Sequence, residues 1–148
     1  MSPPSRDPLL DDMRLALLSE FGARAMYGHL SRSRRDPELA ALLARFCVEE
    51  DEQIAKLRAL MTALGARPPA TSRRRRFAAW LLHLAGCVGW RRFALRLCLE
   101  SEETVARWYA HYAIHLVRTG RAEEARACET LGLTKHRHAL ALQAWIER

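Results

Sequence analysis

The apolar residues of this chain recur in steps of three and four, which is the spacing of amphipathic helices. No segment alternates apolar and polar residues with the two-residue period of a half-buried strand. Glycine and proline are sparse and fall mostly between the periodic stretches. The pattern predicts an all-α chain with four long helices: about 8–30, 37–64, a third from near residue 95 to near residue 120, and a fourth from about residue 122 to the C-terminal end.

The connections between these helices are unequal in length. Short loops join the first helix to the second and the third to the fourth, and Asp36 followed by Pro37 marks a strong helix start. The middle connection contains a basic, proline-bearing linker of about residues 65–76 and then an apolar stretch, residues 77–90. We therefore predict one domain spanning residues 1–148, an antiparallel four-helix bundle made of two helical hairpins joined by a long crossover with a short extra helix.

The second predicted helix carries a seven-residue repeat that is apolar at all but two positions. The apolar positions are Leu39, Leu43, Phe46, Leu57, Leu60 and Leu64. Glu50 and Gln53 occupy the two remaining positions on this seam, where an apolar side chain is expected. The adjacent acids Glu49, Asp51 and Glu52 lie off the seam and are predicted to face solvent.

The two halves of the chain resemble one another weakly. Glu20 precedes Tyr27 by seven residues in the first helix, and Glu102 precedes Tyr109 by seven in the third. The second and fourth helices each carry a polar pair three residues apart on the seam, and these pairs are Glu50 with Gln53 and Lys135 with His138. Residues three apart share one face of a helix, so a bundle would bring these side chains together as a buried polar cluster near its midpoint.

This arrangement resembles the ferritin-like di-metal carboxylate superfamily, which includes the rubrerythrins and in which two helices carry a single Glu and the other two carry an ExxH pair. Four residues of this chain match that ligand pattern, namely Glu20, Glu50, Glu102 and His138. Two residues depart from it, because Gln53 replaces the first His and Lys135 replaces the second bridging Glu. The resemblance implies iron or another divalent metal as the cofactor, with the four matching residues as candidate ligands.

Within the superfamily, the middle of the chain is similar to the demethoxyubiquinone hydroxylases, peripheral membrane di-iron enzymes of ubiquinone synthesis. The similarity lies in "LRALMTALGARP" and in "FAAWLLHLAGCVGWRRFALRLCLESEETVARWYAHY". It implies a metal-dependent oxidoreductase or monooxygenase. It also implies a contact with the membrane surface through a basic and aromatic group, whose members are Arg73, Arg74, Arg75, Arg76, Trp80 and Trp90. A solvated linker is the alternative interpretation of this group.

The two departures from the ligand pattern change the charge of the predicted site. An intact site of four carboxylates and two neutral imidazoles carries −4, which two divalent cations neutralise. Here three glutamates contribute −3 and Lys135 contributes +1, leaving −2. We therefore predict a site that binds at most one metal, or none, with the rest replaced by a buried network of the glutamates and Lys135. Gln53, His138, Tyr27 and Tyr109 are predicted to complete this network.

Two other functions remain open at this point. An active di-iron hydroxylase would require Lys135 to be displaced or neutral, with Glu49 or Glu52 supplying a substitute carboxylate. A non-catalytic interaction module would keep the polar cluster as a structural remnant and dimerise through the apolar middle segment, at a membrane surface. His138 is interpreted equally well as a hydrogen-bonded core residue, and Tyr27 and Tyr109 are more typical of core packing than of redox chemistry.

Charge and composition limit the partners and the location of the chain. The net charge of +7 comes almost entirely from arginines that are spread along the sequence, so a nucleic-acid interface is not favoured. The four cysteines form no CxxC pair and indicate neither a zinc site nor a disulfide framework. The chain begins with no signal sequence and holds no apolar run long enough to span a bilayer. We expect a cytoplasmic protein, with a peripheral membrane contact as the variant.

Overall fold

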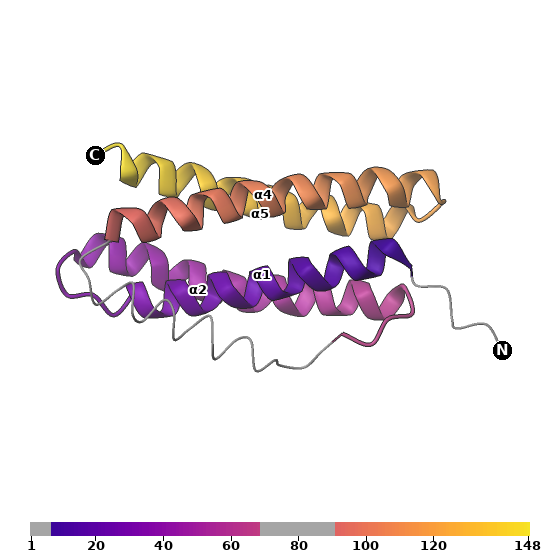
Figure 1. Ribbon diagram of the computed structural model, residues 1–148, viewed down its shortest axis with the longest axis horizontal. Helices are drawn as coiled ribbons and strands as arrows, with labels where there is room; N and C mark the ends of the chain where they lie inside the picture. The colour runs from indigo at the N-terminus through magenta and orange to yellow at the C-terminus, as the bar shows by residue number, and fades with distance from the viewer. Residues whose placement is uncertain (1–6, 69–90) are drawn as a thin grey trace.

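A computed structural model describes residues 7–68 and 91–148 of the chain. These residues form four α-helices and no strand: α1 (Pro8–Leu30), α2 (Pro37–Ala63), α4 (Arg91–Arg118) and α5 (Ala122–Ile146). The helices lie together as a bundle (Figure 1). The all-α prediction and its four long helices are confirmed. Most of the predicted linker, the short extra helix and the proposed membrane-contact residues up to Trp90 lie outside the described residues.

The helix boundaries follow the local signals in the sequence. Asp7 and Asp36 cap α1 and α2, and each carboxylate accepts a hydrogen bond of 3.0 Å from a backbone N–H in the first turn. Proline follows each cap at the first helical position, where its missing N–H costs no hydrogen bond. Gly65 and Gly120 follow α2 and α4 with φ values of +86° and +76°, a conformation that glycine adopts without strain.

The bundle consists of two hairpins that face each other. The chain reverses in the loop between α1 and α2 and again in the short turn between α4 and α5, so that each pair of helices lies side by side (Figure 1). Between the pairs, α1 packs against α4 and α2 packs against α5. Each helix therefore presents one face to its hairpin partner and to one helix of the other hairpin.

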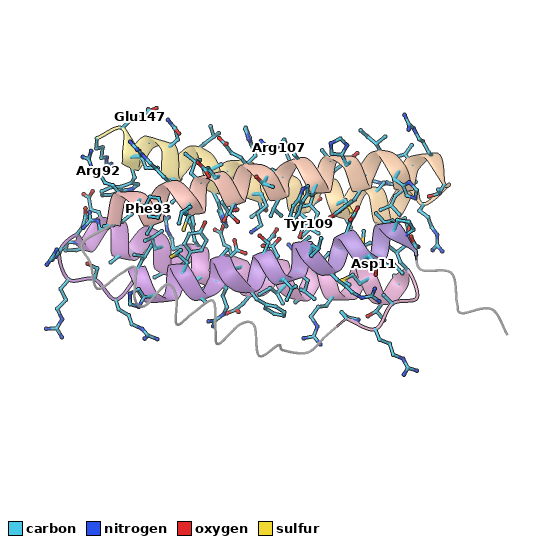
Figure 2. The ribbon with its side chains drawn as sticks, viewed as in Figure 1. Asp11, Arg92, Phe93, Arg107, Tyr109 and Glu147 are labelled. Atoms are coloured by element: carbon cyan, nitrogen blue, oxygen red, sulfur yellow. The ribbon has the colours of Figure 1, made fainter. Side chains whose placement is uncertain are left out.

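The interior contains two apolar clusters separated by a polar layer. One cluster is built around Met13, Leu57 and Leu131, and the other around Leu43 and Leu142. Along α2, α4 and α5, the buried polar residues lie between the residues of the first cluster and those of the second, and on α1 Glu20 lies beside Phe21 near the end of the first cluster. The sticks in Figure 2 show this packed interior between the hairpins. Apolar side chains therefore separate the polar layer from solvent toward both ends of the bundle.

Candidate functional site

Six polar or charged side chains are buried in the described part of the chain, and all six come from the seam positions identified in the sequence. They are Glu20 from α1, Glu50 and Gln53 from α2, Glu102 from α4, and Lys135 and His138 from α5. None of them is more than 2% exposed. Every helix thus contributes at least one member. The helical spacing of three and four residues aims them at one central layer, because such residues share a helix face.

Lys135 lies at the centre of this cluster and points into the bundle. Its ammonium nitrogen, Nζ, lies 2.6 Å from Oε1 of Glu50 and 3.3 Å from Oε2 of Glu102. Nζ is also in direct contact with Oε2 of Glu20. One cation therefore bridges carboxylates from three different helices. An ammonium in this position repels metal cations and neutralises the acids that would bind them.

The two buried tyrosines connect the hairpins in a crossed pattern. The hydroxyl of Tyr109 on α4 donates a hydrogen bond of 2.6 Å to Oε1 of Glu20 on α1. The hydroxyl of Tyr27 on α1 donates to Oε1 of Glu102 on α4. Each tyrosine therefore satisfies the glutamate of the opposite hairpin rather than the glutamate seven residues before it. These are charge-assisted hydrogen bonds across the interface between the hairpins.

His138 links the cluster to the protein surface. Its Nε2 lies 2.5 Å from Oε2 of Glu49, and its Nδ1 lies 3.3 Å from Oε1 of Glu50. The imidazole is stacked on the ring of Phe46, with centroids 4.0 Å apart and an interplanar angle of 22°. His138 is thus a buried, hydrogen-bonded residue whose orientation is fixed by α2.

The prediction that Glu49 simply faces solvent is wrong. Its side chain is 33% exposed, and the same carboxylate oxygen contacts His138 and the guanidinium of Arg137 at 2.9 Å. Asp51 and Glu52 are exposed, as predicted. Glu49 lies one position off the buried seam, and its partner follows 89 residues later in the chain. No local pattern could have identified the contact, because it depends on how close α2 and α5 approach.

The pKa values of the central groups reflect a competition between burial and charge. Burial alone would lower the pKa of Lys135, but the carboxylates of Glu20, Glu102 and Glu50 outweigh it and raise that pKa above its ordinary value. Burial alone would raise the pKa of Glu50, but the nearby imidazole of His138 and the charge of Lys135 lower it to about 2. At neutral pH the centre therefore holds a charged lysine beside an ionised Glu50.

The pKa values of His138 and Glu20 are both raised above their ordinary values. Burial would lower the pKa of His138, but the neighbouring carboxylates of Glu102, Glu50 and Glu49 raise that pKa to about 9. Burial raises the pKa of Glu20 well above its ordinary value, although the charge of Lys135 opposes this. Burial and the adjacent carboxylates also raise the pKa values of Tyr27 and Tyr109 well above their ordinary range, so both hydroxyls remain donors. These protonation states reduce the negative charge available to a metal.

One subset of the cluster has the composition of a metal site. Glu50, Glu102 and His138 each offer a ligand atom, and these atoms lie within 4.8 Å of one another. Each of the three side chains also has a buried atom with no hydrogen-bond partner among the described residues: Oε2 of Glu50, Oε2 of Glu102 and Nδ1 of His138. Two carboxylates and an imidazole suit a first-row divalent ion. The residues present therefore have the ligand chemistry for a divalent ion, and the ammonium of Lys135 lies 3.3 Å from one of these atoms, Oε2 of Glu102.

Gln53 contributes differently from the histidine that the ferritin-like pattern expects at its position. Its side chain is buried, and its carbonyl oxygen Oε1 has no hydrogen-bond partner among the described residues. An unpaired buried carbonyl costs free energy without strengthening the ion pairs. Gln53 is thus a buried polar member of the layer, and its carbonyl oxygen accepts no hydrogen bond among the described residues.

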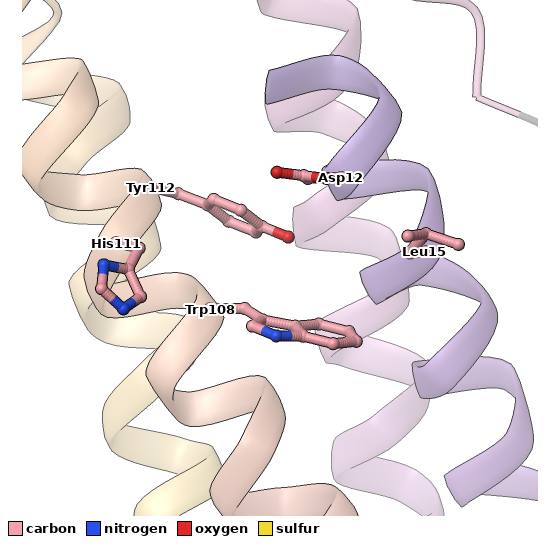
Figure 3. A pocket seen from close by; sticks show the side chains of 5 residues that line it. All are labelled: Asp12, Leu15, Trp108, His111 and Tyr112. Atoms are coloured by element: carbon pink, nitrogen blue, oxygen red, sulfur yellow. The ribbon is translucent and has the colours of Figure 1, made fainter. Parts of the chain in front are cut away.

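A separate pocket lies between α1 and α4, away from the cluster. It has a volume of about 260 Å³ and is lined by Asp12, Leu15, Trp108, His111 and Tyr112. Figure 3 shows the Tyr112 hydroxyl directed toward Asp12 and the Trp108 ring reaching toward α1. Leu15 is 54% exposed at its edge, so the pocket opens to solvent. It shares no residue with the buried cluster and gives no access to it.

Comparisons of this chain with protein-family models, with curated proteins and with solved structures give no match. Among the described helices, none is long and apolar enough to cross a lipid bilayer.

Proposed function

We propose that this chain is an antiparallel ferritin-like bundle in which a lysine-centred ion-pair network replaces the di-metal site, and that it binds at most one divalent ion. The observation that carries the proposal is the position of Lys135 Nζ, in contact with the carboxylates of Glu20, Glu50 and Glu102. A cation held in this way neutralises the acids that would otherwise ligate two metals. The site therefore lacks the means to support conventional di-iron oxygen chemistry.

The charge of the site supports this proposal. With Lys135 and His138 protonated, the three central carboxylates have two positive partners. Three negative and two positive charges leave −1 at the centre without any metal. Two divalent cations would add four positive charges to a site that has little negative charge left. Burying such an excess of charge is strongly unfavourable.

A single ion would be held by Glu50, Glu102 and His138. It would compete with Lys135 for Oε2 of Glu102, which lies 3.3 Å from Nζ, and would leave the contact of Lys135 with Glu20 in place. Binding would require a neutral imidazole, because a protonated one cannot be a ligand. Zinc, manganese or ferrous iron would suit these ligand types.

The active hydroxylase is the less favoured alternative. It requires Lys135 to leave the centre or lose its charge, but three buried carboxylates hold it there and raise its pKa. The suggested substitute carboxylates do not reach the centre either: Glu49 contacts His138 and Arg137, and Glu52 is exposed. The same contacts favour a non-catalytic protein in which the network fixes the pairing of the helices.

Metal counting on the purified protein tests the proposal. The natural chain and two variants are incubated anaerobically with ferrous, manganous or zinc ions, dialysed, and analysed by mass spectrometry for metal per chain. We expect no more than one ion in the natural chain. The double substitution Gln53→His with Lys135→Glu restores both ExxH pairs and should bind two.

The substitution Lys135→Met is the matched control, because it removes the cation without adding a ligand. It should bind fewer ions than the double variant. Two ions per natural chain would overturn the proposal. A double variant that folds, as judged by circular dichroism, and still binds no more metal than the natural chain would also contradict the ferritin-like origin of the site.

A further inference from the structure

The outer side of the α4–α5 hairpin carries a groove that the buried cluster does not use. The groove has a volume of about 750 Å³ and runs between the two helices. Its floor is formed by small residues, with Ala106 and Ala110 on α4 and Gly132 on α5. Gly132 allows the helices to approach closely, since a Cβ atom there would lie 3.4 Å from the Cβ of Tyr109. Leu133 stands at the edge of the groove and is 70% exposed.

Large exposed apolar side chains are concentrated on this hairpin. Of the eight such residues in the described part of the chain, six belong to α4 or α5, and only Leu15 and Val48 belong to α1 and α2. Leu133 and Leu140 are seven residues apart on α5, and Ala110, Ile114 and Val117 follow in steps of four and three on α4. These steps place each set on one helix face, as in the seam of a coiled coil. We refer to the groove and these flanking residues as the α4–α5 outer face.

We propose that the α4–α5 outer face binds the same face of a second copy of this chain, with α4 of each copy lying over α5 of the other. In this arrangement Leu133 of one copy enters the small-residue groove of its partner, and the partner's Leu133 enters the groove of the first copy. A two-fold interface requires this kind of self-complementarity, because one surface must supply both the ridge and the groove. The proposal does not depend on whether metal binds the buried cluster.

The charges beside the groove fit such a pairing. Because α5 folds back along α4, residues equally distant in sequence from Gly120 lie at about the same level on the two helices. Glu103 is therefore level with His136, and Arg107 lies within about one turn of the level of Glu129. A two-fold axis parallel to the helices places Glu103 opposite the partner's His136. It also places Arg107 within reach of the partner's Glu129. Figure 2 shows Arg107 on this outer side, away from α1 and α2.

The size of the face is adequate for a stable dimer. The 28 residues of α4 give it a length of about 42 Å at a rise of about 1.5 Å per residue. Two packed helices are about 20 Å wide. The face therefore offers roughly 800 Å² per copy, which is the area of a standard protein–protein interface. Burial of the exposed leucine, isoleucine and valine side chains supplies the apolar centre of that area.

Sedimentation velocity on the full chain tests the proposal. We expect a mass of twice 16.9 kDa for the natural protein at micromolar concentration. Leu133→Glu places a charge in the centre of the interface and should convert the dimer to a monomer. Leu15→Glu is the matched control, because it places the same charge on a comparably exposed leucine of α1 and should leave the dimer intact.

A charge reversal tests the register of the proposed dimer. Arg107→Glu alone and Glu129→Arg alone should each weaken association by about tenfold or more, and the two together should restore it. Both residues are exposed, so the test does not depend on whether Leu133→Glu folds. A natural protein that remains monomeric would overturn the proposal. So would a dimer that persists in Leu133→Glu, since it would form through another surface. Failure of the double reversal to restore association would overturn the proposed register.

Discussion

The two hairpins have the same polar pattern but opposite electrostatic roles. In each, the first helix supplies a glutamate followed by a tyrosine seven residues later, and the second helix supplies a polar pair three residues apart. The pair on α2 is an acid and an amide, Glu50 and Gln53, whereas the pair on α5 is Lys135 and His138. The α1–α2 hairpin therefore lacks any cation in the buried layer, and the α4–α5 hairpin supplies both cationic groups.

This difference shows that neither hairpin can bury its polar residues alone. The two glutamates of the first hairpin find their cation, Lys135, in the second. The hydroxyls of Tyr27 and Tyr109 also cross to the opposite hairpin. An unpaired buried charge costs several kcal/mol, so a misaligned packing of the hairpins would be strongly disfavoured. The network therefore specifies how the hairpins dock, in addition to any effect it has on metal binding.

The largest effect is expected when the central cation is removed. Lys135→Met should lower the free energy of unfolding by about 3 to 5 kcal/mol, because it leaves buried carboxylates without their partner. Urea denaturation followed by circular dichroism measures this change. Lys56→Met is the control, since Lys56 is the only other lysine and is exposed on α2. A loss equal to that of the control would mean that the hairpins do not depend on Lys135.

The crossed tyrosines should contribute equally to stability if the hairpins are related by symmetry. Tyr27→Phe and Tyr109→Phe each remove one hydrogen bond to a buried glutamate and should cost about 1.5 to 3 kcal/mol. Tyr112→Phe is the control, because its hydroxyl makes no hydrogen bond within the described residues. Measurement by the same denaturation assay should place the two variants close together and the control near zero. Widely different losses for the two would show that the cross-connections are not equivalent.

His138 should make the free energy of unfolding depend on pH above neutrality. The pKa of His138 is raised to about 9 from an ordinary value of 6.5, so its contribution is fully present below pH 6.5 and is lost as the pH rises through about 9. We expect a loss of at most about 3 kcal/mol over this window, measured by denaturation in the presence of a chelator. His138→Gln should flatten this part of the profile. An identical slope in that variant would assign the effect to other groups.

The smallest effect is expected at Gln53, which corresponds to His138 in the repeat. Its buried Oε1 has no hydrogen-bond partner among the described residues. Gln53→Met replaces the amide by an apolar side chain of similar length, so stability should remain within about 1 kcal/mol of the natural protein or rise. His138→Met, the matched substitution in the other hairpin, should be clearly destabilising. Equal losses at the two positions would indicate that Gln53 has a partner beyond the described residues.

The helices and the positions that they bury follow from local signals in the chain. Apolar spacing, the Asp-Pro starts and the glycines after α2 and α4 are local signals, and helix formation is governed by local geometry. The seam pattern also identified the six polar residues that the fold buries, because a helix has only one face to turn inward. The metal content, the catalytic role and the cellular location remain predictions.

The pairing of those residues depends on how the helices pack against one another. Sequence left open whether Lys135 points inward or extends to solvent, and the fold places it among three glutamates from three helices. The same holds for the crossed tyrosines and for Glu49, which reaches His138 from a position that sequence assigned to solvent. These contacts join residues 33 to 115 positions apart on different helices, and helical periodicity carries no information about such contacts. Their geometry depends on the approach of whole helices, which the packing of both apolar clusters sets.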